Sequence, residues 1–334
     1  MADESHNLIL GIDIGGTSLR LALAQSAERV LSRRKVASPA DQDPQVMVDT
    51  ISRLVGELLA EAGGGPLAAV GVSAPGPVDS KSGTLMDPPN LIRFHTVPLR
   101  DLLRRELSAP VALENDANAA VLAEHRMGSG QGVQDMVYVT MSTGIGGGLI
   151  AGGRLITGAR GGAGEIGHIT IDVKGPPCGC GKNGCWEAMA SGTAINKELV
   201  RRVGAGEDSV LAESVRRDPS LVDARAVHEA ALQGDQLSND ILDKVAYYTG
   251  VGLGSVVNIL NPELVVVGGG LTRNGDRILG PAFEICRQQI FPLHNKGLRL
   301  EVSHMGDQVA LLGALVLAAE LREDHCPAPK ASRG

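Results

Sequence analysis

Short apolar runs that end in glycine recur along the chain and predict its strands. The run LILGIDI at residues 8–14 stops at two glycines, and an alternating segment resumes at Leu19, so together they predict a β-hairpin around residues 15–18. A second apolar run, MVYVTMS at 136–142, is followed by a predicted turn, TGIGGG, and by a second predicted strand, LIAGGRLI. The repeated strand, turn and strand indicate two halves built on one plan.

Helical periodicity predicts the elements that follow these hairpins. The segment ELSAPVALENDANAAVLAEHRMG predicts a strand, a turn and a helix, with Asn115 or Asp116 near the helix start. Two further buried strands are predicted at LAAVGVS and ELVVV. The other helices are predicted at residues 46–63, 191–204, 223–234, 239–260 and 309–321.

Composition and charge narrow the class of protein. The 334 residues are 43% hydrophobic and 2% aromatic and include 44 glycines, which is typical of an α/β protein packed with small aliphatic side chains. The formal net charge of −7 offers no basic stripe to neutralise a nucleic-acid backbone, so we expect no nucleic-acid partner. No segment has the roughly 18 uninterrupted apolar residues of a membrane span, and no leader pattern opens the chain, so we expect no membrane partner and a cytoplasmic location.

The glycine turns are candidate phosphate sites. In DIGGT, Asp13 ends a buried strand and precedes two glycines and a threonine, which leaves N–H groups for phosphate oxygens and a carboxylate for hydrated Mg²⁺. For this motif alone, the alternative is an ordinary hairpin turn. Because STGIGGG also follows a strand, the two turns could clamp one phosphate chain from both sides. The glycines at 268–270 could admit a flat adenine or ribose, with a helix-entry loop as the alternative.

The motif ENDANAA places an amide and an acid side by side at a helix start. Capping explains one of Asn115 and Asp116 and does not require both. The pair suits a polyol, because an amide donates and accepts hydrogen bonds while a carboxylate accepts a hydroxyl proton. In phosphoryl transfer such a carboxylate orients the attacking hydroxyl and takes its proton late, so a catalytic Asp116 is favoured over a cap.

Three of the five cysteines lie within eight positions in CGCGKNGC, shortly after the histidine of GGAGEIGH. One imidazole and three thiolates fit tetrahedral Zn²⁺. A disulfide is disfavoured because the first two cysteines are too close to pair comfortably, and a redox pair usually has C-x-x-C spacing. Glu187 follows the last cysteine, so a rigid metal loop could fix its carboxylate, with a solvated surface acid as the alternative. The candidate metal ligands are His168, Cys178, Cys180 and Cys185.

Six segments, in order, resemble the bacterial sugar kinases of the ROK family: DIGGTSLRLAL, SAPGPVD, ENDANAA, STGIGGGLIAGGRLITGARGGAGEIGH, CGCGKNGCWEA and NPELVVVGGGL. The resemblance implies a two-lobed α/β fold of the actin-like ATPase (ribonuclease H-like) type, with mixed sheets flanked by helices and an inserted zinc loop. It implies a small lobe at 1–114, with a closing helix at 308–322 packing back on it, and a large lobe at 115–307 with the zinc loop at 168–187. We expect a disordered tail at 325–334.

The resemblance also implies which residues form the site. Asp116 would be the base toward the 6-hydroxyl of a hexose, with ATP and Mg²⁺ as cosubstrate and a structural Zn²⁺. The residues implied to contact the sugar are Gly76, Asn115, Asp116, Glu165, His168 and Glu187. The residues implied to bind the nucleotide are Asp13, Gly15, Gly16, Thr17, Thr143, Gly144, Gly268, Gly269 and Gly270.

The expected function is therefore an ATP-dependent hexose 6-kinase, with glucose as the favoured sugar. An N-acetylglucosamine or N-acetylmannosamine kinase is the alternative within enzymes, and a non-catalytic sugar-sensing regulator is the alternative from another class. Regulators of this family carry a DNA-binding segment before the first glycine motif, whereas seven residues precede Leu8 here, and both Asp13 and Asp116 are present. By base rate we expect a homodimer or a dimer of dimers.

Overall fold

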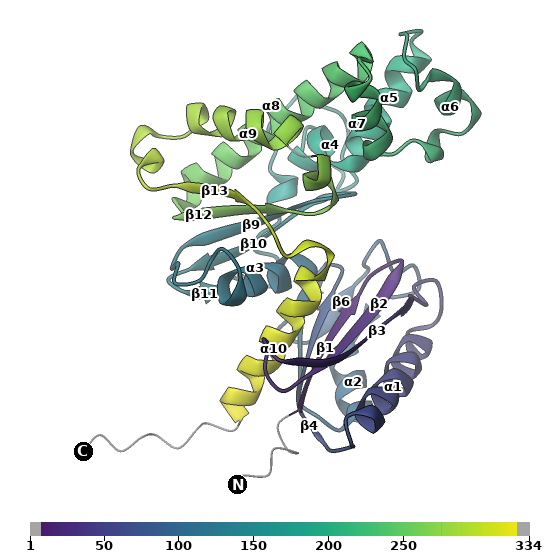
Figure 1. Ribbon diagram of the computed structural model, residues 1–334, viewed down its shortest axis with the longest axis vertical. Helices are drawn as coiled ribbons and strands as arrows, with labels where there is room; N and C mark the ends of the chain where they lie inside the picture. Colours follow the sequence, from purple (N-terminus) through teal and green to yellow (C-terminus); the bar gives the residue numbers. More distant parts are fainter. Residues whose placement is uncertain (1–7, 275, 326–334) are drawn as a thin grey trace.

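Two five-stranded mixed sheets form the framework of the protein, of which the computed structural model describes residues 8–274 and 276–325 (Figure 1). The first sheet contains β1 (Leu8–Ile14), β2 (Ser18–Ala24), β3 (Val30–Ala37), β4 (Leu67–Ala74) and β8 (Val111–Asn115). The second sheet contains β9 (Met136–Met141), β10 (Ile145–Ala151), β11 (Arg154–Leu155), β12 (Leu264–Gly268) and β13 (Arg299–Val302).

The strands of the two sheets correspond one to one. Their orders are β3-β2-β1-β4-β8 and β11-β10-β9-β12-β13. In each sheet, three successive strands pair antiparallel and the remaining two join the sheet in parallel. The predictions of two halves built on one plan and of a two-lobed α/β fold with mixed sheets are therefore confirmed.

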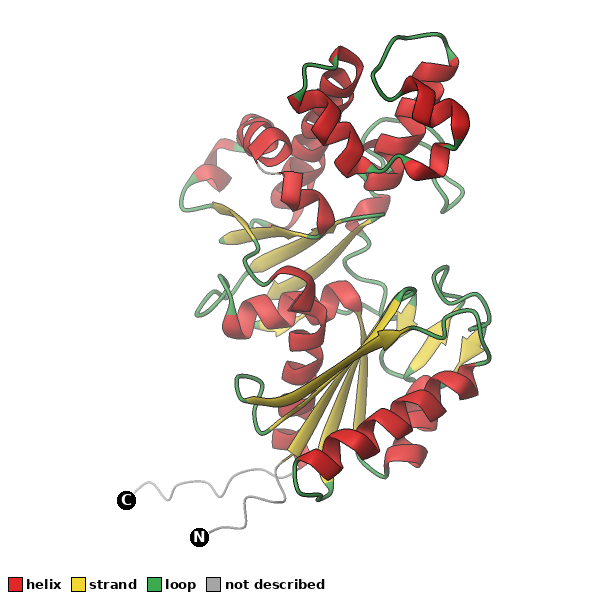
Figure 2. Ribbon diagram, turned by 45° about the vertical axis from the view of Figure 1, so that its right-hand side comes forward, coloured by secondary structure: helices red, strands yellow, loops and turns green. Residues whose placement is uncertain are grey.

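Helices surround both sheets. They are α1 (Pro44–Glu61), α2 (Leu99–Leu107), α3 (Asp116–Met127), α4 (Trp186–Ala190), α5 (Gly192–Gly204), α6 (Ala212–Arg217), α7 (Ala224–Leu232), α8 (Gln236–Leu260), α9 (Asp276–Gln289) and α10 (Val309–His325). A small sheet of β5 (Val78–Asp79), β6 (Thr84–Met86) and β7 (Thr96–Val97) lies beside the first sheet. Figure 2 shows α1 and α10 on opposite faces of the first sheet. No helix among the described residues has the length and apolar character needed to cross a bilayer.

Glycines in the first sheet let α10 approach it closely. A Cβ at Gly71 of β4 would lie 1.9 Å from the carbonyl oxygen of Ala314, and one at Gly11 of β1 would lie 2.8 Å from Leu315 Cγ. Because real Cβ atoms do not approach so closely, a larger residue at either position would push α10 away. Glycine in these strands therefore sets the position of the last helix.

The helix that follows the last strand of each sheet packs against the other sheet. α3 follows β8 of the first sheet but packs against β9 and β10 of the second, whereas α10 follows β13 of the second sheet but packs against β1 and β4 of the first. α3 and α10 also pack against each other between the sheets (Figure 1). The lobe boundary at residues 114 and 115 stays a prediction. The predicted tail at 325–334 lies outside the described residues, apart from His325, the last residue of α10.

The turn predicted at TGIGGG is wrong in extent. Residues 146–148 belong to β10, so only residues 142–144 separate it from β9, and residues 152–153 interrupt the strand predicted at LIAGGRLI. A Cβ at Gly148 would lie 2.4 Å from the carbonyl oxygen of Ala117 in α3. A Cβ at Gly147 would lie 2.5 Å from Ile166 Cδ1, so close packing of α3 and of the segment at 164–166 on β10, rather than turn geometry, explains these two glycines.

Candidate active site

A cavity of about 220 Å³ lies where the start of α3, the start of β10 and the segment before α4 meet. All six residues predicted to contact a sugar line this cavity, which we call the sugar cavity. They are Gly76, Asn115, Asp116, Glu165, His168 and Glu187. A small polyol inside it would face the polar side chains of five of them, and such a concentration of hydrogen-bonding groups is typical of a carbohydrate site.

Helix capping accounts for Asn115 and is not needed to explain Asp116. Asn115 is the N-cap residue of α3, and its Oδ1 accepts the backbone N–H of Asn118 at 2.6 Å. Asp116 is the first residue of the helix, and it lines the sugar cavity. The sequence left open which of the two residues is the cap, and the structure assigns that part to Asn115.

The electrostatic environment of Asp116 favours its protonated form. Asp116 is exposed, but the protein around its carboxyl group keeps most of the bulk water away, and this loss of hydration raises its pKa to about 6, with the negative charges of Asp13 and then Glu165 adding to the effect. A carboxylate with a pKa close to neutrality is a better proton acceptor at neutral pH than an ordinary one, because less free energy separates its two protonation states.

The raised pKa of Asp116 predicts an acid limb in any activity that uses it as a base. A protonated carboxyl group cannot accept the hydroxyl proton, so kcat/KM is expected to fall as the pH drops through about 6. The measurement is kcat/KM for the best sugar between about pH 5 and pH 8, at saturating nucleotide. A profile that stays flat through the acid end of this range would contradict a base with this pKa.

Asp13 lies buried at the end of β1, close to Asp116. Its Oδ1 accepts the hydroxyl of Ser73 at 3.3 Å, and its Oδ2 lies 3.4 Å from Nη1 of Arg20. Burial raises the pKa of Asp13, while Arg20 and the Ser73 hydroxyl oppose this shift. The motifs pointed to neither partner, but the hairpin register, which pairs Asp13 with Arg20, is a signal that could have found Arg20.

The tip of the β1–β2 hairpin carries Gly15, Gly16 and Thr17. The backbone N–H of Gly15 donates to the carbonyl oxygen of Ser18 at 2.9 Å, which closes the hairpin. A Cβ at Gly16 would lie 3.0 Å from the carbonyl oxygen of Asn90, so glycine lets the tip pass close to that loop. The tip residues line neither the sugar cavity nor the two larger cavities beside it, so their contact with phosphate stays a prediction.

The second glycine turn, residues 142–144, borders a cavity of about 930 Å³, which we call the large cavity. Of the predicted nucleotide residues, Thr143 and Gly270 line it. The start of α5 holds the turn, because the N–H groups of Gly192 and Thr193 donate to the carbonyl oxygens of Ser142 and Thr143 at 2.8 and 3.2 Å. These two hydrogen bonds fix the position of the turn against α5.

The glycines after β12 differ in their surroundings. Gly268 is buried, and a Cβ there would lie 2.2 Å from the hydroxyl oxygen of Tyr138. Gly269 has a φ of +94° and lies against the backbone of Met141, so glycine is needed for its conformation and for space. Of these three glycines, only Gly270 lines the large cavity, and contact of any of them with an adenosine stays a prediction.

The four predicted metal ligands come together in space. One ligand atom from each of His168, Cys178, Cys180 and Cys185 lies within 4.8 Å of all the others. Cys178 Sγ is 3.6 Å from His168 Nδ1, and the sulfurs of Cys180 and Cys185 are 3.6 Å apart. Zinc bonds of about 2.3 Å to sulfur and about 2.1 Å to nitrogen place tetrahedral ligand atoms about 3.6–3.8 Å apart. The cluster therefore fits a structural zinc ion, and its cysteines form no disulfide.

The cysteine cluster leads directly to Glu187. Cys185 is the N-cap residue of α4, whose first residue, Trp186, is fully buried against Gly252 of α8. Glu187 Oε2 accepts the backbone N–H of Ile145 at 3.0 Å, at the start of β10. The contact with Ile145 and the buried Trp186 thus hold the Glu187 carboxylate on the wall of the sugar cavity, while a contribution of bound metal to its position stays a prediction.

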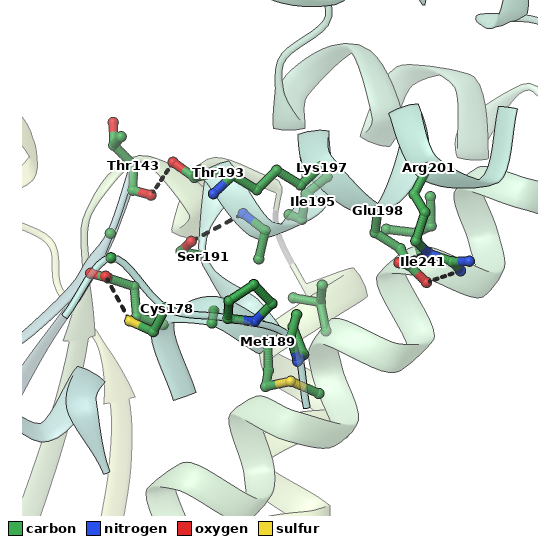
Figure 3. Close-up of a pocket in the computed structure, with 18 of the residues that line it drawn as sticks. Thr143, Cys178, Met189, Ser191, Thr193, Ile195, Lys197, Glu198, Arg201 and Ile241 are labelled. Atoms are coloured by element: carbon green, nitrogen blue, oxygen red, sulfur yellow. Dashed lines mark hydrogen bonds and ion pairs between the residues drawn. The ribbon is translucent and has the colours of Figure 1, made fainter. Parts of the chain in front are cut away.

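A third cavity, of about 550 Å³, borders both others and was not anticipated from the sequence (Figure 3). It shares Glu187 with the sugar cavity and Thr143 with the large cavity. On its far wall, Glu198 is paired with Arg201 at 2.8 Å and with Lys244 at 3.2 Å. These partners, Arg201 first, lower the pKa of Glu198 to about 2, so this wall remains ionised and carries a net positive charge.

Comparison with known proteins identifies the family of the chain. The model of the ROK family matches residues 9–321. The chain belongs to the ROK family. The resemblance seen in the motifs is therefore confirmed, and it extends over nearly all of the described residues.

Relatives of this ROK protein include sugar kinases of more than one specificity. It is 34% identical over 312 residues to a glucokinase of Thermotoga maritima, covering 93% of this chain and 97% of the relative. It is 33% identical over 309 residues to an N-acetylmannosamine kinase of Shigella boydii, covering 92% of this chain and 97% of the relative. Xylose repressors and a ROK transcriptional regulator are also similar to it.

A solved relative shows what a ROK protein of this fold binds. The ROK glucokinase of Streptomyces griseus was crystallised with glucose and AMPPNP, is 34% identical to this chain and superimposes with a TM-score of 0.77. The match covers 94% of this chain and 99% of that one. In sequence and fold, the chain is therefore a glucokinase-like ROK protein.

Proposed function

We propose that the protein is an ATP-dependent hexose kinase of the cytoplasm that transfers the γ-phosphoryl group to the 6-hydroxyl of glucose. The observation that carries the proposal is the position of Asp116. It lines a sugar-sized cavity, its neighbour Asn115 serves as the helix cap, and its pKa is raised to about 6. The glucokinases among the relatives support glucose as the sugar.

The residues that line the sugar cavity would have different roles in sugar binding and in proton transfer. Asn115, Glu165, His168 and Glu187 would accept or donate hydrogen bonds to the other sugar hydroxyls, which leaves the 6-hydroxyl facing Asp116. Asp116 would orient that hydroxyl and receive its proton as the bond to phosphorus forms. Asp13 and the two glycine turns would hold the nucleotide, whose Mg²⁺ supplies charge neutralisation when bound.

The metal cluster would position residues without taking part in the reaction. If zinc is bound through Nδ1 of His168, Nε2 remains on the side of Glu165, whose Oε2 is 4.0 Å away. One imidazole could thus serve both the metal and the sugar cavity. We also propose a homodimer or a dimer of dimers, to be tested by light scattering of the purified protein.

A panel of sugars tests the proposed function. ADP release would be measured with glucose, mannose, fructose, N-acetylglucosamine and N-acetylmannosamine under identical conditions. We expect the highest kcat/KM with glucose, because the small sugar cavity leaves little room for an N-acetyl group. The similarity to an N-acetylmannosamine kinase makes that sugar the second candidate. A higher kcat/KM with an N-acetylhexosamine would select it, and turnover with none of the five would favour a sugar-sensing regulator.

A further inference from the structure

Negative charge is concentrated where the proposed reaction would bring a nucleotide. The carboxylates of Asp13, Asp116 and Glu165 lie close enough to interact electrostatically. A nucleotide triphosphate is itself an anion, so these carboxylates oppose its approach unless positive charge lies beside them.

Arg20 supplies positive charge next to Asp13. It stands opposite Asp13 in the β1–β2 hairpin, so both side chains lie on the same face of the sheet. Its Nη1 is 3.4 Å from Asp13 Oδ2, while Ser73 donates to Oδ1 at 3.3 Å. Both oxygens of the carboxylate thus have a partner, and the pair fixes its orientation.

Arg20 is also tied to the segment that joins the lobes. The 3-10 turn η6 (Gly306–Gln308) connects β13 of the second sheet to α10, which packs on the first. The same Nη1 of Arg20 donates to the carbonyl oxygen of Asp307, and the Asp307 side chain is paired with Arg273, which lines the large cavity. Arg20 therefore links Asp13 to the rim of the cavity that borders the second glycine turn.

We propose that Arg20 is a positioning residue for nucleotide binding, which holds the Asp13 carboxylate in place and offsets the negative charge that the phosphates meet. This inference rests on the proposed function, in which Asp13 and the second glycine turn face one nucleotide. Arg20 does not line the sugar cavity, so we expect its replacement to leave sugar binding unchanged.

The chain offers a matched control for Arg20. Arg33 of β3 donates to the side chain of Gln308 in the same η6 segment, but it is not within ion-pair distance of Asp13. Arg20→Met removes the charge and keeps much of the length, Arg20→Lys keeps the charge, and Arg33→Met removes only an anchor of η6. Binding of AMPPNP at saturating Mg²⁺ and of glucose alone would be measured by calorimetry, together with the KM of each substrate.

Arg20→Met is expected to weaken AMPPNP binding and to raise the nucleotide KM by about 10-fold or more, the usual effect of losing a hydrogen bond between charged groups. Glucose binding should stay as in the wild type, Arg20→Lys should recover part of the loss, and Arg33→Met should behave as wild type. An equal loss in Arg33→Met, or wild-type AMPPNP binding by Arg20→Met, would overturn the proposal. Because nucleotide binding is measured directly, the test stands even if no sugar in the panel is phosphorylated.

Discussion

Asp116→Asn is expected to lower kcat by about 100-fold or more, the size of a general-base effect. The amide keeps the shape of the side chain but cannot accept the hydroxyl proton. Because Asn115 is the cap of α3, the helix start is not disturbed by the change. The measurement is kcat with the best sugar and saturating nucleotide, together with sugar affinity by calorimetry, which we expect to change little.

Glu114→Gln is a matched control for this variant. Glu114 is a buried carboxylate two positions earlier, and loss of hydration raises its pKa as it does that of Asp116, but it does not line the sugar cavity. A glutamine there can still accept the side-chain N–H of Asn118, which Glu114 Oε2 accepts at 2.9 Å. If Asp116→Asn and Glu114→Gln retained similar activity, Asp116 would have no role as a base.

Asp116→Asn should also stabilise the fold at neutral pH. The pKa of Asp116 is raised from 3.8 to about 6, so the stability that its protonated form contributes is full below 3.8 and is lost as the pH rises through about 6. Asparagine carries no charge at any pH, so its advantage over aspartate should be small near pH 4 and larger near pH 7. Thermal unfolding of both proteins at the two pH values measures this. A lower midpoint for the variant near pH 7 would show that the charge helps to hold the fold.

Cys180→Ala is expected to abolish zinc binding and to weaken sugar affinity by about 10-fold or more, because the loop that carries Glu187 loses its metal crosslink. Cys180 is the exposed member of the cluster, so its replacement removes a ligand with little loss of packing. Elemental analysis should find about one zinc per chain in the wild type and almost none in the variant.

Cys286→Ala separates the metal effect from the loss of a thiol. Cys286 is a buried residue of α9 outside the cluster, so its removal should lower stability but leave zinc content and sugar affinity unchanged. A chelator that strips the metal should reproduce the Cys180→Ala phenotype. Native protein without metal, or wild-type sugar affinity in metal-free Cys180→Ala, would contradict a positioning role for the cluster.

The sequence predicts those parts of the site that are formed by residues close together in the chain. The apolar run before DIGGT places Asp13 at a strand end, and the start of a helix at ENDANAA places Asn115 and Asp116 together. The spacing of three cysteines and a histidine sufficed to predict the cluster, because a metal constrains ligand type and number strongly. These features depend on a few neighbouring residues each.

Contacts between distant segments could not be predicted in the same way. The glycines of β10 were taken for a turn because nothing local shows that α3 and the segment at 164–166 pack on them. The bounds of α9 were not predicted, and Pro281 within it is a residue that usually ends a helix. Arg20 lies within the segment DIGGTSLRLAL, but no local pattern singles it out, and its proposed role follows from the hairpin register and from a turn nearly three hundred positions away in the chain.

The most direct test is a crystal structure of the protein with glucose and AMPPNP. The account predicts that the glucose 6-hydroxyl lies within hydrogen-bond distance of an Asp116 carboxylate oxygen, about 2.6–3.2 Å, and faces the terminal phosphate. Glucose bound in the sugar cavity with another hydroxyl toward Asp116, or with Asp116 turned away from every sugar oxygen, would contradict it.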